Sequence, residues 1–134
     1  KLPWEEFTET KLQAAQAENK TVLARFSADW SNALKTVDKF ALNTRETKRL
    51  VEQHDIVTLY ADYTHQSPEI KRWLEKFDSV SVPLTVIFPG NQPNRPIVIR
   101  DTYTKTTLLK NLNAAVGATA PTTKQANLPQ SASR

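Results

Sequence analysis

Ser31 is the residue best placed to do chemistry in this chain, because it follows a buried apolar run and opens a segment with helical spacing. The run and the segment together are residues 21–35, TVLARFSADWSNALK. A strand that delivers a helix N-terminus to the surface brings unpaired backbone N–H groups and the positive end of the helix dipole together. A developing anion would be favoured at such a junction.

A catalytic serine also needs a general base that a third group orients. The chain has two histidines, and we expect His54 at the end of a helix and His65 in a loop. Their positions in the sequence give no reason to expect either histidine next to Ser31. Serine is also among the residues preferred at helix N-caps, so we interpret Ser31 as a cap rather than a nucleophile.

Several other chemistries lack the residues they require. The absence of cysteine excludes disulfides, thiolate metal sites and cysteine nucleophiles. The histidines and the scattered carboxylates show no metal-ligand spacing. Gly90 and Gly117 are the only glycines, so a glycine-rich phosphate loop cannot form. We predict neither a metal ion nor a cofactor.

Two residues beside the junction need an explanation of their own. Arg25 stands inside the apolar run, where a charge is costly unless it is paired or reaches water. We predict that the carboxylate of Asp62 or Asp29 meets it; alternatively, its long stem carries the charge to the surface. Trp30 is either a recognition aromatic or a shield over the end of the strand.

The hydrophobic pattern around the junction predicts alternating helices and strands. Strands are expected at residues 21–27, 56–61, 84–88 and 97–101, with the last two antiparallel. Helices are expected at residues 8–20, 31–42, 43–55, 67–77 and 104–117. The break before the third helix is placed at Asn43, because Glu46 three residues later resembles a capping box. Residues 118–134 are small, polar and proline-bearing, so we predict one domain at 1–117 and a flexible tail or linker at 118–134.

The charge of the chain argues against a nucleic-acid partner. The net charge is +4, but residues 1–101 contain fourteen basic and fourteen acidic side chains, and the remaining basic residues are spread out rather than clustered. No apolar run is long enough to cross a bilayer. The chain begins at Lys1 without methionine, so we expect a processed product or a piece of a longer protein.

The predicted order of elements resembles the thioredoxin-like family, an α/β fold with a central four- to five-stranded mixed sheet flanked by helices. Residues 26–30, FSADW, followed by Lys35, are similar to the family's approach to its Cys-x-x-Cys motif. Val82-Pro83 before a strand resembles the family's cis-proline element. Residues 61–64, ADYT, and the broken helix are most similar to the carboxy-terminal domain of the thiol:disulfide interchange protein DsbD.

The resemblance implies a redox site whose reactive atoms are missing. The family's two cysteines would fall at Ser31 and Leu34, and Arg25 stands where the family often has a buried acid. Disulfide exchange needs an attacking thiolate and a resolving thiol, and neither sulfur is present. We therefore predict no catalytic residue and regard Ser31, Leu34 and Arg25 as degenerate motif positions.

The resemblance also implies a groove for an extended polypeptide, which family members pair with the residue before the proline. We predict binding at Trp30, Ser31, Val82 and Pro83, by a redox-inactive scaffold or interaction module. The partner would be an extended polypeptide or another domain of the parent protein, and the domain itself monomeric. Alternatives are an oxidoreductase domain whose cysteines were substituted in this chain, and a purely structural domain of a larger membrane-associated protein. The resemblance implies the bacterial periplasm or another extracytoplasmic face.

Overall fold

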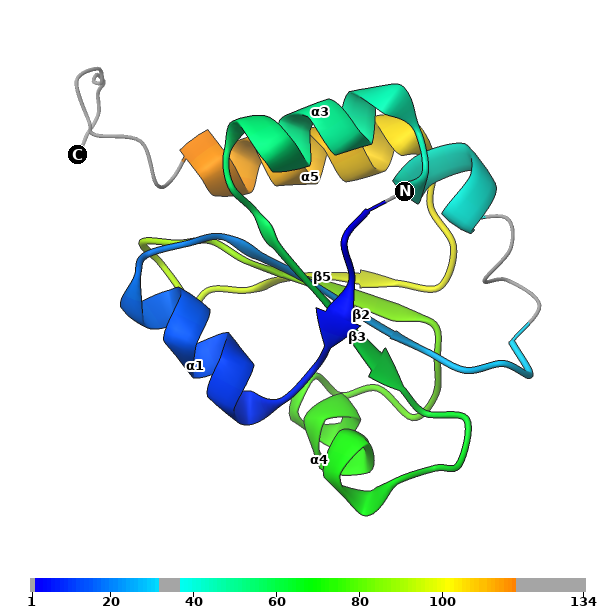
Figure 1. Ribbon diagram of the computed structural model, residues 1–134. Helices are drawn as coiled ribbons and strands as arrows, with labels where there is room; N and C mark the ends of the chain where they lie inside the picture. Colours follow the sequence, from blue (N-terminus) through cyan, green and yellow to red (C-terminus); the bar gives the residue numbers. More distant parts are fainter. Residues whose placement is uncertain (1, 32–36, 118–134) are drawn as a thin grey trace.

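Five strands form one mixed sheet at the centre of the computed structural model, which describes residues 2–31 and 37–117 (Figure 1). The strands are β1 (Glu5–Glu6), β2 (Val22–Ser27), β3 (Val57–Asp62), β4 (Leu84–Phe88) and β5 (Ile97–Arg100). Their order across the sheet is β1-β3-β2-β4-β5. β1 and β2 run parallel to β3, whereas β4 is antiparallel to both β2 and β5. The predicted antiparallel pair at the end of the chain is therefore confirmed.

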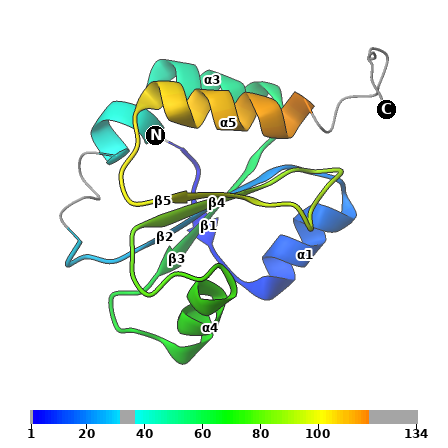
Figure 2. The same cartoon turned by 180° about the vertical axis from the view of Figure 1, so that it is seen from behind.

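Helices cover both faces of this sheet. They are α1 (Glu9–Ala17), the π-helix η1 (Asp38–Leu42), α3 (Arg45–Gln53), α4 (Pro68–Lys76) and α5 (Lys105–Gly117). α1 and α4 lie on one face, and α3, α5 and η1 lie on the other (Figures 1 and 2). Within the described residues, no helix combines the length and apolar character needed to span a membrane.

The structure confirms most of the elements that the sequence predicts. β2 is buried along its whole length, as expected of a central strand. Thr8 and Ser67 cap α1 and α4 by accepting a hydrogen bond from a backbone N–H in the first helical turn. The first turns of the helix predicted from Ser31 fall on residues 32–36, and the predicted tail falls on 118–134; both lie outside the described residues.

β1 is the one strand that the sequence analysis does not predict. It contains only Glu5 and Glu6, both exposed, so it has neither an apolar run nor an alternating pattern. It forms because the backbone pairs with the outer edge of β3, and the N–H of Phe7 continues this pairing by donating to the carbonyl of Tyr60 at 2.8 Å. A strand made by backbone pairing alone leaves little trace in the side chains.

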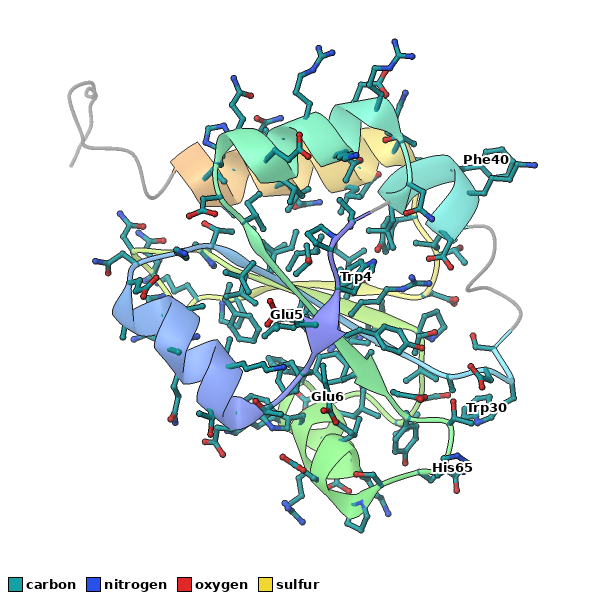
Figure 3. The ribbon with its side chains drawn as sticks, in the orientation of Figure 1. Trp4, Glu5, Glu6, Trp30, Phe40 and His65 are labelled. Carbon is teal, nitrogen blue, oxygen red and sulfur yellow. The ribbon has the colours of Figure 1, made fainter. Side chains whose placement is uncertain are left out.

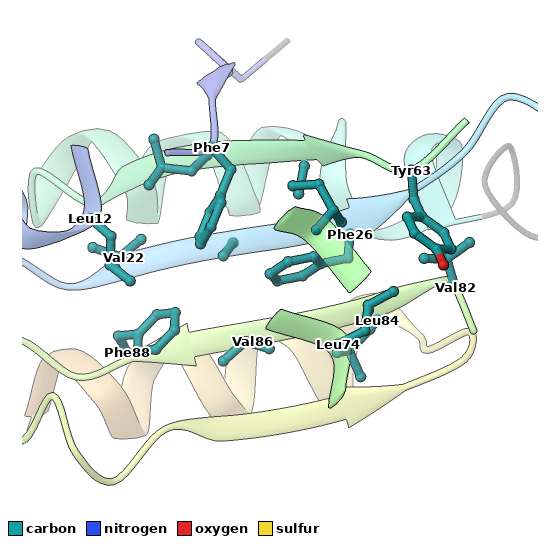
Figure 4. Packing of buried hydrophobic residues seen from close by; sticks show 14 of the residues in the cluster. Phe7, Leu12, Val22, Phe26, Tyr63, Leu74, Val82, Leu84, Val86 and Phe88 are labelled. Carbon is teal, nitrogen blue, oxygen red and sulfur yellow. The ribbon is translucent and has the colours of Figure 1, made fainter. Parts of the chain in front are cut away.

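The core on the α1 and α4 face is rich in aromatic residues (Figure 4). Phe7 packs against Phe26 and Trp73, with ring centroids 5.2 Å apart in both pairs. Phe77 extends the cluster to Phe88 on β4 at 6.1 Å. These tilted and edge-on contacts are the geometries that aromatic quadrupoles favour. They tie the amino-terminal segment and α4 to the two central strands.

The core on the opposite face depends on η1. The N–H of Asn43 donates to the carbonyl of Asp38 at 2.8 Å, which is the wide i to i+5 turn of a π-helix. Val37, Ala41 and Leu42 are all buried against α5 and the sheet. Three apolar residues at this turn thus face the core, while Asp38 is directed at Arg25 in β2, as described below.

The cap of α3 corrects the sequence prediction by one residue. Asn43 ends η1, and Thr44 is the N-cap of α3, where its Oγ1 accepts a hydrogen bond from the N–H of Thr47 at 3.2 Å. Thr47 is fully buried and its own hydroxyl donates to the carbonyl of Ala41 at 2.7 Å. The two threonines therefore connect the end of η1 to the start of α3, a role that the Asn43–Glu46 spacing does not reveal.

We expect replacement of Thr44 by alanine to lower the free energy of unfolding by about 1 kcal/mol, because α3 loses its capping oxygen. The matched change Asn43→Ala should cost less, because the Asn43 side chain caps no helix. Urea denaturation of both variants measures the difference. An equal loss in the two variants would contradict the assignment of the cap to Thr44.

Candidate functional site

The predicted site residues gather at one end of the sheet. β2 and β3 end there, β4 begins there and β5 ends there, because Ser27 pairs with Asp62 and Leu84 pairs with Arg100 in the strand register. We call this end of the strands the carboxyl end of the sheet. Open α/β sheets place ligand sites outside the carboxyl ends of their parallel strands. The residues Trp30, Ser31, Val82 and Pro83 all lie in the connections at this edge.

Trp30 follows the end of β2 and is half exposed, at 49%. Its Nε1 donates a hydrogen bond to the carbonyl of Thr64 at 3.1 Å, which holds the indole against the loop after β3 (Figure 3). Ser31 is next in the chain, and its N–H donates to the carbonyl of Ala28 at 3.0 Å. The indole is thus fixed at one end while half of its surface remains open to a ligand.

Thr64 joins the two loops at the carboxyl end of the sheet. Its Oγ1 accepts a hydrogen bond from the N–H of Asp29 at 2.9 Å and donates to the carboxylate of Asp62. The N–H of Thr64 also donates to that carboxylate, at 2.9 Å. Hydrogen bonds to the ionised form, first from the hydroxyl and then from the N–H, hold the pKa of Asp62 below its usual range. The sequence analysis did not identify Thr64 as a positioning residue.

Val82 and Pro83 form the other side of the site. The peptide bond between them is cis, and the Val82 side chain is buried beside Tyr63 in the aromatic core (Figure 4). A groove of about 410 Å³ runs along this connection. It is lined by Asp78, Ser79, Val80, Ser81, Val82, Pro83, Arg100 and Asp101. Val80 is 99% exposed, so an apolar side chain stands free at the mouth of the groove.

Arg25 has a carboxylate partner, but not one that the sequence analysis named. The guanidinium pairs with Asp38 on η1, whereas Asp62 and Asp29 take part in the Thr64 network. Arg25 is only 4% exposed, so the alternative in which its stem carries the charge to the surface is wrong. Asp38 is the first residue of the π-helix η1, so ordinary helical spacing gives no signal that it faces Arg25.

Polar side chains surround this ion pair in the core on the α3, α5 and η1 face. The register places Tyr60 and Thr85 on either side of Arg25. The hydroxyl of Thr85 forms a hydrogen bond with that of Tyr103 at 2.9 Å. Burial raises the pKa of both Tyr60 and Tyr103 above the ordinary tyrosine range, so both phenols stay neutral at physiological pH. Ser27 Oγ, two residues after Arg25, is buried and has no hydrogen-bond partner among the residues that the structure describes.

The two histidines do not form a catalytic pair with Ser31. His54 ends α3, which leads into the start of β3 at the opposite end of the sheet. His65 lies in the exposed loop beside Trp30 (Figure 3), but no hydrogen bond links it to Ser31. Within residues 2–31 and 37–117, no group of three or more histidine and acidic side chains is arranged to hold a metal ion. Leu34 lies outside the described residues.

Comparisons with known proteins agree with this architecture. A sequence model described as thioredoxin-like matches residues 3–90. The thiol:disulfide interchange protein DsbD of Yersinia enterocolitica is 34% identical over 86 residues, and that of Photorhabdus laumondii is 30% identical over 89 residues. The matches cover 61% and 66% of this chain but only 14% of each relative, so the chain spans about a seventh of the length of these proteins.

Solved structures share the fold at lower identity. The crystal structure of the oxidised c-terminal domain of Neisseria meningitidis DsbD matches with a TM-score of 0.65 and 18% identity, over 83% of this chain and 99% of that one. The solution structure of a Thermus thermophilus thioredoxin gives a TM-score of 0.66 and 19% identity, over 84% of this chain and 85% of that one. The predicted thioredoxin-like fold is therefore confirmed.

We expect Asp38→Ala to lower the free energy of unfolding by about 2 kcal/mol, because it removes the carboxylate from a buried guanidinium while Asp38 itself is partly exposed. The double variant Arg25→Met, Asp38→Ala should be more stable than this single variant, because the buried charge is then gone. Urea denaturation of the parent, of Arg25→Met, of Asp38→Ala and of the double variant completes the double-mutant cycle. Glu46→Gln, which breaks the exposed pair with Lys105, is a control that should change little. Additive losses at Arg25 and Asp38 would contradict the coupling.

We expect Thr64→Val to raise the pKa of Asp62 toward its ordinary value, because the hydroxyl donor is lost. A lowered folded pKa stabilises the protein above the unfolded carboxyl pKa of about 3.9, and this contribution disappears as the pH falls through the folded value. Thr64→Val should therefore lose less stability than the parent on acidification. NMR titration of the Asp62 carboxyl carbon measures the pKa directly. Thr64→Ser, which keeps the hydroxyl, should leave it low; a rise in both variants would refute the assignment.

Proposed function

Because this chain belongs to the thioredoxin-like family, we propose that it is a DsbD-like domain that has lost thiol:disulfide chemistry and binds an extended polypeptide at the carboxyl end of its sheet. The polypeptide is a separate chain or a segment of another domain of the parent protein. The binding residues are Trp30, Ser31, Val82 and Pro83. The domain acts as a monomeric interaction module at the periplasmic or another extracytoplasmic face of a bacterium.

The loss of redox activity follows from the chemistry of the side chains. The family's cysteine positions are occupied by Ser31 and Leu34, and the whole chain lacks cysteine. An alcohol cannot form a disulfide, and an alkyl side chain offers no lone pair for attack on sulfur. Arg25 stands at the position where the family often has a buried acid, and it pairs with Asp38. A chain with these residues cannot exchange disulfides, whatever its partner.

The observation that carries the binding proposal is the backbone of Val82. Its N–H has no hydrogen-bond partner in the described part of the chain, and the residue lines the groove. A backbone donor that the protein itself leaves unpaired can accept a carbonyl partner from a ligand. An extended polypeptide laid along residues 80–83 would supply a carbonyl, which is recognition by strand addition.

Two exposed apolar side chains lie at the same end of the sheet as this donor. Val80 projects at the mouth of the groove, and Trp30 is half exposed in the connection after β2 at the same end of the sheet. Tryptophan held by a hydrogen bond offers a large contact area at a small entropic cost, because its ring is already positioned. An extended polypeptide with an apolar side chain would therefore find both a backbone partner and an aromatic anchor.

The alternative is that the natural protein is a thiol:disulfide oxidoreductase and that this chain carries substituted cysteines. The names of the curated relatives favour it. Serine is a common isosteric replacement for cysteine, but the leucine at position 34 is not. The Arg25–Asp38 pair would require further coordinated changes. Reading the encoding gene decides the matter: cysteine codons at positions 31 and 34 would overturn the redox-inactive proposal.

The binding proposal is tested by NMR titration with a short neutral peptide of alternating apolar and serine residues. We expect the Val82 amide and the Trp30 indole N–H to shift together and saturably. Trp30→Ala should weaken binding by about tenfold, the loss expected for a buried aromatic anchor. Phe40→Ala is the matched control, because Phe40 is 60% exposed but lies on η1, away from Trp30 (Figure 3).

A saturable shift at Phe40 with none at Val82 would contradict the site. No shift at any residue would leave the purely structural domain as the better explanation, because that domain has the same fold without a ligand. A shift at Val82 that Trp30→Ala leaves unchanged would restrict binding to the groove of residues 78–83 and would refute the role of the indole.

A further inference from the structure

The groove beside Val82 has an acidic rim. Asp78 and Asp101 line the groove itself, and both are exposed. Asp29 and Asp62 stand on the facing connections, after β2 and at the end of β3, at the same carboxyl end of the sheet. Four carboxylates from four separate segments of the chain therefore lie at the same end of the sheet as the residues that the proposed function assigns to binding.

These four carboxylates lack cationic partners among the described residues. The ion pairs of residues 2–31 and 37–117 join Glu5, Glu18, Asp55, Asp38 and Glu46 to lysine or arginine. Asp62 is ionised and is satisfied only by the hydroxyl and N–H of Thr64, which are neutral donors. The negative charge of the rim is thus not neutralised by those parts of the chain.

The described cations near the rim are fewer than its carboxylates. Arg100 lines the groove, and its Nη2 donates to the carbonyl of Phe77 at 2.5 Å, which orients the guanidinium but leaves its positive charge in place. Arg25 is buried and paired with Asp38. His65 is exposed beside Trp30 (Figure 3). Among residues 2–31 and 37–117, carboxylates therefore outnumber exposed cations at this end of the sheet.

This local excess is opposite in sign to the whole chain, which carries a net charge of +4. A general acidic character cannot explain it. Like-signed charges around a recess focus the field there and raise the local concentration of opposite charge. They also exclude partners of the same sign, because placing like charges together is unfavourable.

We infer that the polypeptide bound in the groove is basic, with lysine or arginine side chains flanking an apolar residue. This inference rests on the proposed function and adds the chemical class of its ligand. The apolar residue would contact Val80, the backbone would pair with Val82, and the flanking cations would meet Asp78 and Asp101 on one side and Asp29 and Asp62 on the other. A flanking cation could also lie over the exposed indole of Trp30.

The test compares three short peptides with the same apolar centre, flanked by lysine, by serine or by glutamate. Dissociation constants come from NMR titration of the parent chain, followed at the Val82 amide. At low salt we expect the lysine peptide to bind about tenfold tighter than the serine peptide, and the glutamate peptide to bind more weakly than both. High salt should narrow these differences, because exposed charges are screened.

Variants that remove negative charge show which carboxylates cause the preference for the lysine peptide. Asp78 and Asp101 have positive φ angles of 55° and 67°, a conformation that asparagine also tolerates, so Asp→Asn at both positions removes charge without backbone strain. The double variant should lose several-fold affinity for the lysine peptide and none for the serine peptide. Asp55→Asn is the matched control: φ is 52° there, the residue is exposed, and it precedes β3 at the opposite end of the sheet.

The outcomes separate the two proposals. Equal affinity for the lysine and serine peptides, or preference for glutamate, would overturn the basic ligand while leaving polypeptide binding intact. An equal loss in Asp55→Asn and in the double variant would also overturn it, because the effect would then follow net charge rather than the rim. If no peptide shifts Val82, the proposed function itself fails.

Discussion

The buried charge of Arg25 is the constraint on which the rest of this structure depends. A guanidinium in the middle of a fully buried strand must have an anion within reach, because the interior cannot solvate it as water does. Asp38 supplies that anion from η1. The pair therefore fixes the position of η1 against β2. The wide π turn is what allows Asp38 to face the strand while its neighbours Ala41 and Leu42 fill the core.

This arrangement changes what the junction after β2 can offer to a partner. In a redox protein of this fold the reactive atoms would stand at the positions of Ser31 and Leu34. Here the chain has no cysteine, and the strand that leads to Ser31 carries the Arg25–Asp38 ion pair beside two neutral phenols. What remains outside is a held indole, an unpaired backbone donor and a set of carboxylates. Recognition without covalent chemistry is the function for which such groups are suited.

Most of the fold could be predicted from the sequence, because its central elements carry strong side-chain patterns. β2 and β4 are buried along their whole length and consist mostly of apolar residues, and Ser67-Pro68 marks the start of α4 without ambiguity. The partner of Arg25 could not be predicted in the same way, because it depends on a π turn that ordinary helical spacing does not anticipate. The role of Thr64 was hidden for a related reason: its contacts join residues thirty-five positions apart. Sequence patterns report local conformation and burial, whereas these contacts depend on the completed register of the sheet.

β1 has a consequence for how this protein meets other chains. An exposed sheet edge is a template on which a second polypeptide can pair without regard to its sequence, and this is a common route to aggregation. β1 covers the edge of β3 with two residues, and both are glutamates with exposed side chains. So short an edge presents few open backbone groups, and its charge repels an identical strand from a second molecule. β1 thus makes unspecific strand pairing at this edge of the sheet less favourable. The backbone donor of Val82, at the carboxyl end of the sheet, stays available for pairing.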